Sequence, residues 1–218
     1  MYIAIIGDII HSKEINKSTR NEVQQKLMII LKDINNEYEN EIAAKFLITI
    51  GDEFQGLLLD PKNIFRMIDR IQFKMYPIKL RFGIGIGDID TEINRDMAIG
   101  ADGPAYHNAR KMLEVIKLLE KGKLSGSANI LIKSSNEEDR KMIDLINNNL
   151  QLCSFIDDKW TDKQRHLIEL MFLEEKNQTE AANILGIAQS SVQRRLKSAG
   201  YYDYFSARDL AVVTLTNR

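Results

Sequence analysis

Cysteine is almost absent from this chain, with Cys153 as the single one among 218 residues. A lone cysteine excludes an internal disulfide framework and fits a reducing compartment. An excess of charge of either sign is lacking too, because 30 basic and 31 acidic residues leave a net charge of −1. No global field therefore favours nucleic acid or acidic lipid, and such a partner would have to be bound by a local patch.

Long apolar runs are also missing, and none approaches the roughly 18 residues that are needed to span a bilayer. The first residues do not follow the charged, apolar, small order of a signal peptide. We therefore expect a cytoplasmic protein with no membrane partner. Internal repeats and low-complexity tracts are absent, and a hydrophobic content of 44% suits one large or two small domains with a buried core.

Apolar runs of strand length alternate with helical periodicity through the first 135 residues. The predicted order is β-α-β-β-α-β-α-β, and its first six elements match the ferredoxin-like split βαβ arrangement. The sequence thus predicts an α+β domain over residues 1–135, a helical linker over 136–158 and a small all-α domain over 159–218. The predicted strands cover residues 2–6, 46–50, 54–59, 80–86 and 129–132.

Two carboxylates are placed where strands end, Asp8 after the first strand and Asp52 in a tight hairpin beside Gly51. The first and third strands are neighbours in a ferredoxin-like sheet, so Asp8 and Asp52 are expected to converge. Two such carboxylates repel unless a cation lies between them, and Mg²⁺ accepts hard oxygen ligands and bridges to phosphates. Arg110, after the fourth strand, could neutralise charge on a transferring phosphoryl group.

These segments resemble the catalytic domains of class III nucleotidyl cyclases. Residues 8–10 (Asp-Ile-Ile) resemble their Asp-Ile-Val, whose aspartate binds metal, and residues 49–52 (Thr-Ile-Gly-Asp) resemble the hairpin with the second metal aspartate. Residues 51–54 (Gly-Asp-Glu-Phe) also resemble the signature of GGDEF diguanylate cyclases. The resemblance implies that Mg²⁺ or Mn²⁺ is held by Asp8, Ile9 and Asp52. It also implies that a nucleotide is bound by Gly51, Glu53 and Arg110.

The whole chain is similar to the SatD family, on residues 7–9 (Gly-Asp-Ile), 51–56 (Gly-Asp-Glu-Phe-Gln-Gly), 81–85 (Arg-Phe-Gly-Ile-Gly) and 100–106 (Gly-Ala-Asp-Gly-Pro-Ala-Tyr). Departures from the cyclase pattern affect base recognition. Ile48 stands where cyclases that use ATP resemble one another in having lysine, and Tyr106 stands where the asparagine is expected. Asn108 lies two residues away from Arg110, on another side of the helix. The glycines at 83, 85 and 87 indicate close approach of backbone or ligand to the sheet.

The last 60 residues are predicted to be helical and resemble the helix-turn-helix of bacterial regulators. Thr161 with Gln164 forms a capping-box pattern, and Thr179 is expected to cap a second helix that ends before a turn at Gly186. A third helix is predicted from 189 to 198. Its outward residues suit base edges and phosphates, and a homodimer is expected because a single reading head binds DNA poorly. These predicted DNA-binding residues are Gln189, Ser190, Gln193, Arg194 and Lys197.

Three interpretations stay open. The leading one is a DNA-binding regulator whose cyclase-like domain senses a nucleotide with magnesium. The alternative is an active Mg-dependent nucleotidyl cyclase or nucleotidyltransferase that releases pyrophosphate, with Asp8, Asp52 and Arg110 as catalytic residues. The third is a degenerate scaffold that binds no nucleotide, in which Asp8 and Asp52 serve only as turn or cap residues.

Overall fold

The computed structural model describes residues 1–14, 16–49, 51–122 and 128–217. Ile50, which the sequence places at the end of the second strand, lies outside the described residues. Residues 123–127, in the Gly/Ser-rich stretch before the last strand, lie outside them as well. No helix in the described parts of the chain is long and apolar enough to cross a membrane.

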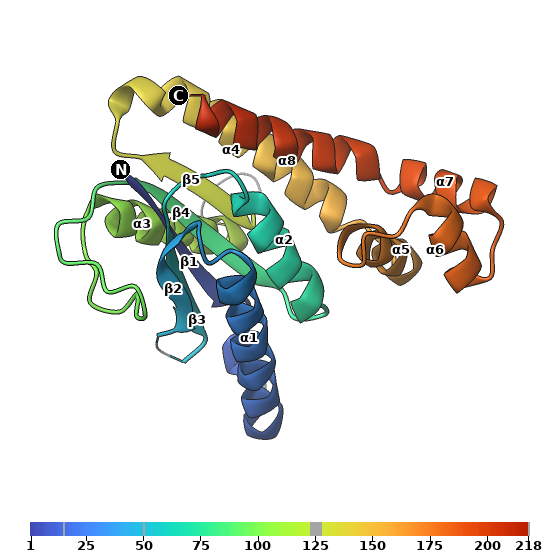
Figure 1. Cartoon of the computed structure of the whole chain (residues 1–218), viewed down its shortest axis with the longest axis horizontal. Coiled ribbons are helices and arrows are strands. Elements are labelled where there is room, and N and C mark those ends of the chain that lie inside the picture. Colours follow the sequence, from blue (N-terminus) through green and yellow to red (C-terminus); the bar gives the residue numbers. More distant parts are fainter. Residues whose placement is uncertain (15, 50, 123–127, 218) are drawn as a thin grey trace.

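One mixed sheet of five strands forms the body of the molecule, with the order β2-β3-β1-β4-β5 (Figure 1). The first four strands are antiparallel neighbours, as a split βαβ arrangement requires, and β5 adds in parallel to β4. The α+β, ferredoxin-like prediction is therefore confirmed for this part. The strands are β1 (Tyr2–Ile9), β2 (Ile42–Ile48), β3 (Glu53–Leu58), β4 (Leu80–Gly87) and β5 (Ile130–Ser134).

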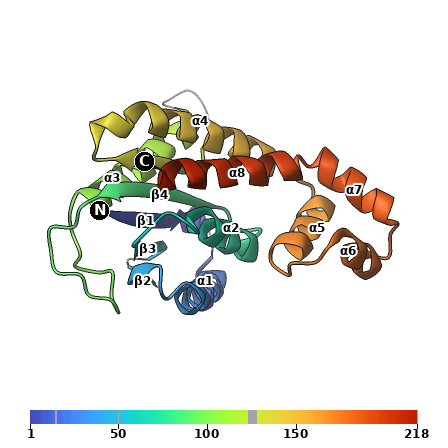
Figure 2. The ribbon, with the colours of Figure 1, turned by 45° about the horizontal axis from the view of Figure 1, so that its top comes forward.

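Four helices cover one face of the sheet: α1 (Lys17–Glu37), α2 (Ile64–Met75), α4 (Arg140–Asp157) and α8 (Tyr201–Thr216). Their apolar residues join those on one side of the strands in a single large core. Ala211 and Leu215 of α8 belong to this core. The last helix of the chain therefore packs on the body formed by the first half of the sequence (Figure 2).

The opposite face is covered by α3 (Pro104–Glu120), which lies on the glycines of β4. A Cβ atom added at Gly83 would meet the carbonyl oxygen of Ala109 at 2.0 Å, and one at Gly85 would meet that of Ala105 at 1.9 Å. Only glycine leaves room for such a close contact between a helix backbone and a strand. The sequence-based interpretation of these glycines as points of close approach is thus confirmed.

Three further helices lie at one end of the molecule, away from the sheet (Figures 1 and 2): α5 (Asp162–Phe172), α6 (Gln178–Leu185) and α7 (Gln189–Ser198). They share a second apolar core centred on Trp160, whose indole N–H donates to the Ala199 carbonyl at 2.7 Å. Phe73 of α2 stacks on Trp160 with ring centroids 5.8 Å apart. The second core is therefore joined to the sheet body through α2.

Most of the caps, turns and bounds predicted for these helices agree with the structure. The capping box of Thr161 and Gln164 is present, and Gly186 has the left-handed backbone (φ 62°) that its turn requires. The third helix has the predicted bounds. The prediction of Thr179 as a cap is wrong, because Asn177 accepts from the first free N–H groups of α6 and begins the helix earlier.

Candidate active site

Asp8 is a strand residue rather than the residue after a strand, because β1 continues to Ile9. Within the ladders it pairs with Glu53 of β3 on one side and with Arg81 of β4 on the other. It is on the same side of β1 as Ile6, the side that α3 covers. Asp8 thus lies between the central strands and α3.

Two cations hold the Asp8 carboxylate. Oδ2 is 2.5 Å from Nζ of Lys117 and accepts from Nη2 of Arg81 at 3.2 Å. The Asp8 side chain is only 7% exposed, and its other oxygen, Oδ1, is buried with no hydrogen-bond partner among the described residues. A buried carboxylate oxygen that lacks a partner is costly, so this atom is suited to an additional cation or donor.

A second ion pair adjoins the first on the same face. Arg110 of α3 donates from both terminal nitrogens to the Glu53 carboxylate, at 3.0 and 3.2 Å. Arg81 also binds Glu120, at the end of α3. The resulting cluster of alternating acids and bases, which we call the α3-face cluster, consists of Asp8, Glu53, Arg81, Arg110, Lys117 and Glu120.

The structure thus brings together three of the predicted site residues, Asp8, Glu53 and Arg110. The carboxylate that lies opposite Asp8 in the sheet is that of Glu53, not that of Asp52 as expected. Asp52 lies in the hairpin turn, immediately before Glu53. Gly51 has a left-handed backbone (φ 67°), and its carbonyl accepts from the side chain of Gln24. Glu53 was expected between the strands but is the first residue of β3.

Ile9 can contribute only its backbone to a metal site. Its side chain is 2% exposed and packs in the core on the other face of the sheet. No group of three His, Cys, Asp or Glu side chains suitable for a metal ion occurs in the described part of the chain. Magnesium, however, often takes only one or two protein carboxylates together with substrate phosphates.

Sequence reasoning missed Arg81, Lys117 and Glu120. A signal existed for two of them. Arg81 is the one charged residue in a strand of apolar residues and glycine. Lys117 follows Arg110 by seven residues, which is two helical turns on the same face of α3.

Tyr106, which stands at the position of the expected asparagine, and the nearby Asn108 both have structural roles in this protein. Asn108 is buried and donates to the Ile86 carbonyl at 3.1 Å and to Oγ of Ser135 at 2.8 Å, so it ties α3 to the sheet. Tyr106 is buried against the sheet, and burial raises the pKa of its hydroxyl well above the ordinary value. Neither residue is available to take the role of the expected asparagine.

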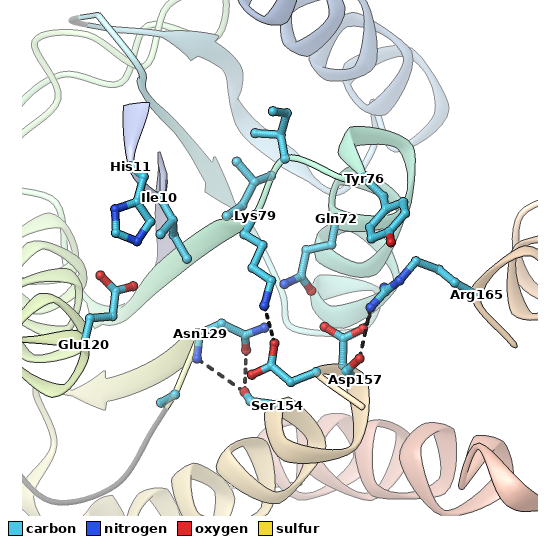
Figure 3. Close-up of a pocket in the computed structure, with 14 residues that line it drawn as sticks. Ile10, His11, Gln72, Tyr76, Lys79, Glu120, Asn129, Ser154, Asp157 and Arg165 are labelled. Carbon is cyan, nitrogen blue, oxygen red and sulfur yellow. Dashed lines mark hydrogen bonds and ion pairs between the residues drawn. The ribbon is translucent and has the colours of Figure 1, made fainter. Parts of the chain in front are cut away.

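A cavity of about 330 Å³ opens at the end of the sheet where β1 ends and β4 begins (Figure 3). It lies between the sheet and the joint of α4 and α5, and Glu120 belongs to both this cavity and the α3-face cluster. Arg165 donates to Asp157 at 2.8 Å on its far wall, yet burial raises the pKa of the Asp157 carboxyl. Amide groups of Gln72 and Asn129 also line it (Figure 3).

The predicted DNA-binding residues are all exposed on one helix. Val192 and Leu196 of α7 are buried, and Ser191 and Arg195 are half-buried. The helix carries three basic residues and no acidic one. Its exposed polar residues include the five predicted ones, Gln189, Ser190, Gln193, Arg194 and Lys197.

The strand order and the α3-face cluster define an α+β sheet domain with a charged site on one face, joined to a helical unit. The chain belongs to the SatD family, since the model of that family matches residues 2–215. A search of curated proteins finds no match.

Several solved cyclase structures are similar to part of the chain. A bacterial light-regulated adenylyl cyclase is 14% identical, with a TM-score of 0.44 over 60% of this chain and 74% of that one. The catalytic core of a rhodopsin-guanylyl cyclase with converted specificity, in complex with ATPαS, is 15% identical, with a TM-score of 0.38 over 51% and 70%. The guanylate cyclase domain of RhGC from Catenaria anguillulae, in complex with GTP, is 13% identical, with a TM-score of 0.36 over 51% and 71%.

Proposed function

We propose that the chain binds a nucleoside triphosphate with Mg²⁺ at the α3-face cluster and acts on it as a nucleotidyl cyclase or nucleotidyltransferase that releases pyrophosphate. The observation that carries this proposal is the buried Oδ1 of Asp8, which has no partner among the described residues and lies on the sheet face that also bears Glu53. The same oxygen would serve a domain that only senses the nucleotide, as in the leading sequence-based interpretation of a DNA-binding regulator, so activity has to distinguish the two.

The residues present fit a magnesium ion. Asp8 offers a carboxylate oxygen without a partner among the described residues. Asp52 is in the hairpin turn and immediately precedes Glu53, the residue that pairs with Asp8. Asp8 and Asp52 would hold the ion, with the Ile9 carbonyl as a further oxygen donor. When bound, Mg²⁺ would polarise the phosphate and neutralise developing charge.

The chain itself supplies the cations that a triphosphate needs. Arg81 and Lys117 both form ion pairs with Asp8, and Arg110 forms one with Glu53. These contacts neutralise the acids. Arg81 and Lys117 would be available to phosphate oxygens if Asp8 held Mg²⁺, and Arg110 lies on the same face of the sheet. Arginine suits this exchange because its fork matches phosphate as well as carboxylate.

The test is pyrophosphate release from each of the four ribonucleoside triphosphates, with Mg²⁺ and then Mn²⁺. Asp8→Asn and Asp52→Ala should abolish release, whereas Asp96→Asn, which removes an exposed carboxylate paired with Lys45, should leave it unchanged. Nucleotide binding without release in the wild type would leave the sensor interpretation. Neither binding nor release would refute the proposal in favour of a scaffold.

We further propose that α7 binds DNA, which the exposed residues and positive charge of this helix support. Arg194→Ala combined with Lys197→Ala should weaken DNA binding at low salt and reduce the salt dependence by about two counterions, one for each phosphate contact. Lys32→Ala on α1, an exposed lysine far from α7, should have no effect. Unchanged affinity in the double variant would refute the role of α7.

A further inference from the structure

The helix α8 is apolar on more than one side, although only one side packs on the body. Ala211 and Leu215 are 1% exposed in the core, whereas Leu210 and Val213 are 63% and 53% exposed. A helix that is apolar all round is normally buried all round. The outer side of α8 therefore lacks a partner in the single chain.

The neighbouring helix α4 has an exposed stripe of the same kind. Leu145 and Leu152 are 71% and 64% exposed and are seven residues apart, so they share one side of the helix. The two helices run antiparallel, because Asn149 donates to the Ala207 carbonyl at 2.9 Å while Cys153 contacts the carbonyl of Tyr204. Figure 1 shows them side by side along the outside of the molecule.

One exposed leucine from each helix borders a common groove. A groove of about 460 Å³ runs between α4 and α8, and both Leu145 and Leu210 line it. Ser206 and Ala207 supply small side chains between these leucines. The same surface therefore offers large apolar side chains and a hollow that can receive them, which is what a self-complementary interface requires.

Charges at the two ends of this surface also complement each other. Lys141 is four residues before Leu145 on α4, and Asp203 is seven residues before Leu210 on α8. Because the helices are antiparallel, these exposed charges lie toward opposite ends of the groove. A two-fold axis through the middle would bring Lys141 to the partner's Asp203, and the reverse pair would form at the other end.

We propose that a second copy of this chain packs its α4–α8 pair on this surface, so that four helices form a symmetric dimer. Exposed contiguous apolar patches of this kind mark interaction sites. Because the two-fold axis repeats each contact, the interface contains two copies of each leucine contact and of each ion pair. This interface uses neither the α3-face cluster nor α7, so it stands or falls independently of the proposed functions.

The oligomeric state of the full chain tests this proposal, by analytical ultracentrifugation over a range of concentrations. The wild type should be a dimer, and Leu210→Lys or Leu145→Lys should weaken dimerisation at least about 100-fold, because each change removes two buried leucines from the interface. Ile29→Lys on α1 replaces an isoleucine of similar exposure (60%) outside the surface and should leave the dimer intact. A monomeric wild type, or a dimer that is unaffected by both leucine variants, would overturn the proposal.

A charge reversal distinguishes this interface from loss of folding. Lys141→Asp should weaken the dimer by placing two acids together at each end of the groove, and adding Asp203→Lys should restore it by reforming the pair in the opposite sense. Both positions are on the surface, so the monomers should keep the wild-type circular dichroism spectrum. Failure of the second change to restore affinity would contradict the proposed two-fold arrangement.

Discussion

Replacing Gly85 with alanine should separate α3 from the sheet. The new Cβ would lie 1.9 Å from the Ala105 carbonyl oxygen and 2.4 Å from the Ala109 nitrogen, both backbone atoms that no rotamer change can move. An ordinary contact requires about 3.4 Å, so helix and strand must part by about 1.5 Å. Overpacking of this kind costs roughly 1–3 kcal/mol of folding free energy.

The consequence for the candidate site follows from the same movement. Arg110 and Lys117 extend from α3 to carboxylates at 3.0 and 2.5 Å, and a shift of about 1.5 Å would break both contacts. Thermal unfolding should therefore show a melting temperature lower by roughly 2–12 °C for a chain of this size. Any pyrophosphate release should fall together with the stability.

Gly87 provides the comparison for this experiment. A Cβ there would meet the side-chain oxygen of Ser135 at 2.7 Å and the backbone nitrogen of Ala105 at 2.9 Å, which are milder overlaps than 1.9 Å. Gly87→Ala should therefore be less destabilising than Gly85→Ala. If Gly85→Ala melts within about 1 °C of the wild type, α3 does not lie on β4 as described and the reasoning fails.

Two further predictions concern the contacts that join the helices to the body. Burial raises the pKa of Asp69 to about 6 in spite of its ion pair with Arg208 at 3.2 Å. The folded chain therefore holds this proton more tightly than the unfolded chain, and the contribution of Asp69 to stability falls as the pH rises from about 4 to about 6. In urea titrations, the unfolding free energy of the wild type relative to Asp69→Asn should be larger at pH 5 than at pH 7 by about 1 kcal/mol, and an equal difference at both pH values would contradict this. Trp160→Phe should lower stability by about 2 kcal/mol, measured by calorimetry, because the Ala199 carbonyl loses a buried donor.

The sheet was predictable from the sequence because the split βαβ order admits few arrangements. Five apolar runs separated by helical periodicity gave the number and order of the strands. Their ends were less predictable. A charged residue normally ends an apolar run, so Asp8 was placed after the strand, yet Arg81 and Lys117 provide the partners that let it remain inside.

The candidate site was predicted only in part, because the exact register of the strands could not be predicted. The register pairs Asp8 with Glu53 rather than with Asp52, and register depends on where the hairpin turn closes. The turn closes through the Thr49 N–H and the Glu53 carbonyl at 2.8 Å, a contact that the sequence alone does not specify. Arg110 was found because an arginine after the fourth strand can neutralise a transferring phosphoryl group, whereas only the spacing of seven residues from Arg110 marks Lys117.

The two apolar cores are joined by contacts of α2 with residues from the last third of the chain. On α2, Phe73 stacks on Trp160, and Asp69 accepts from the Tyr204 hydroxyl at 2.9 Å and pairs with Arg208. Each of these contacts ties the body to a residue beyond position 159, and α8 then returns to fill the body core. Because buried ion pairs leave a costly unpaired charge when one partner moves away, α8 and α2 are held to one arrangement. A displacement of α2 relative to α8 would therefore break the Asp69 contacts with Tyr204 and Arg208.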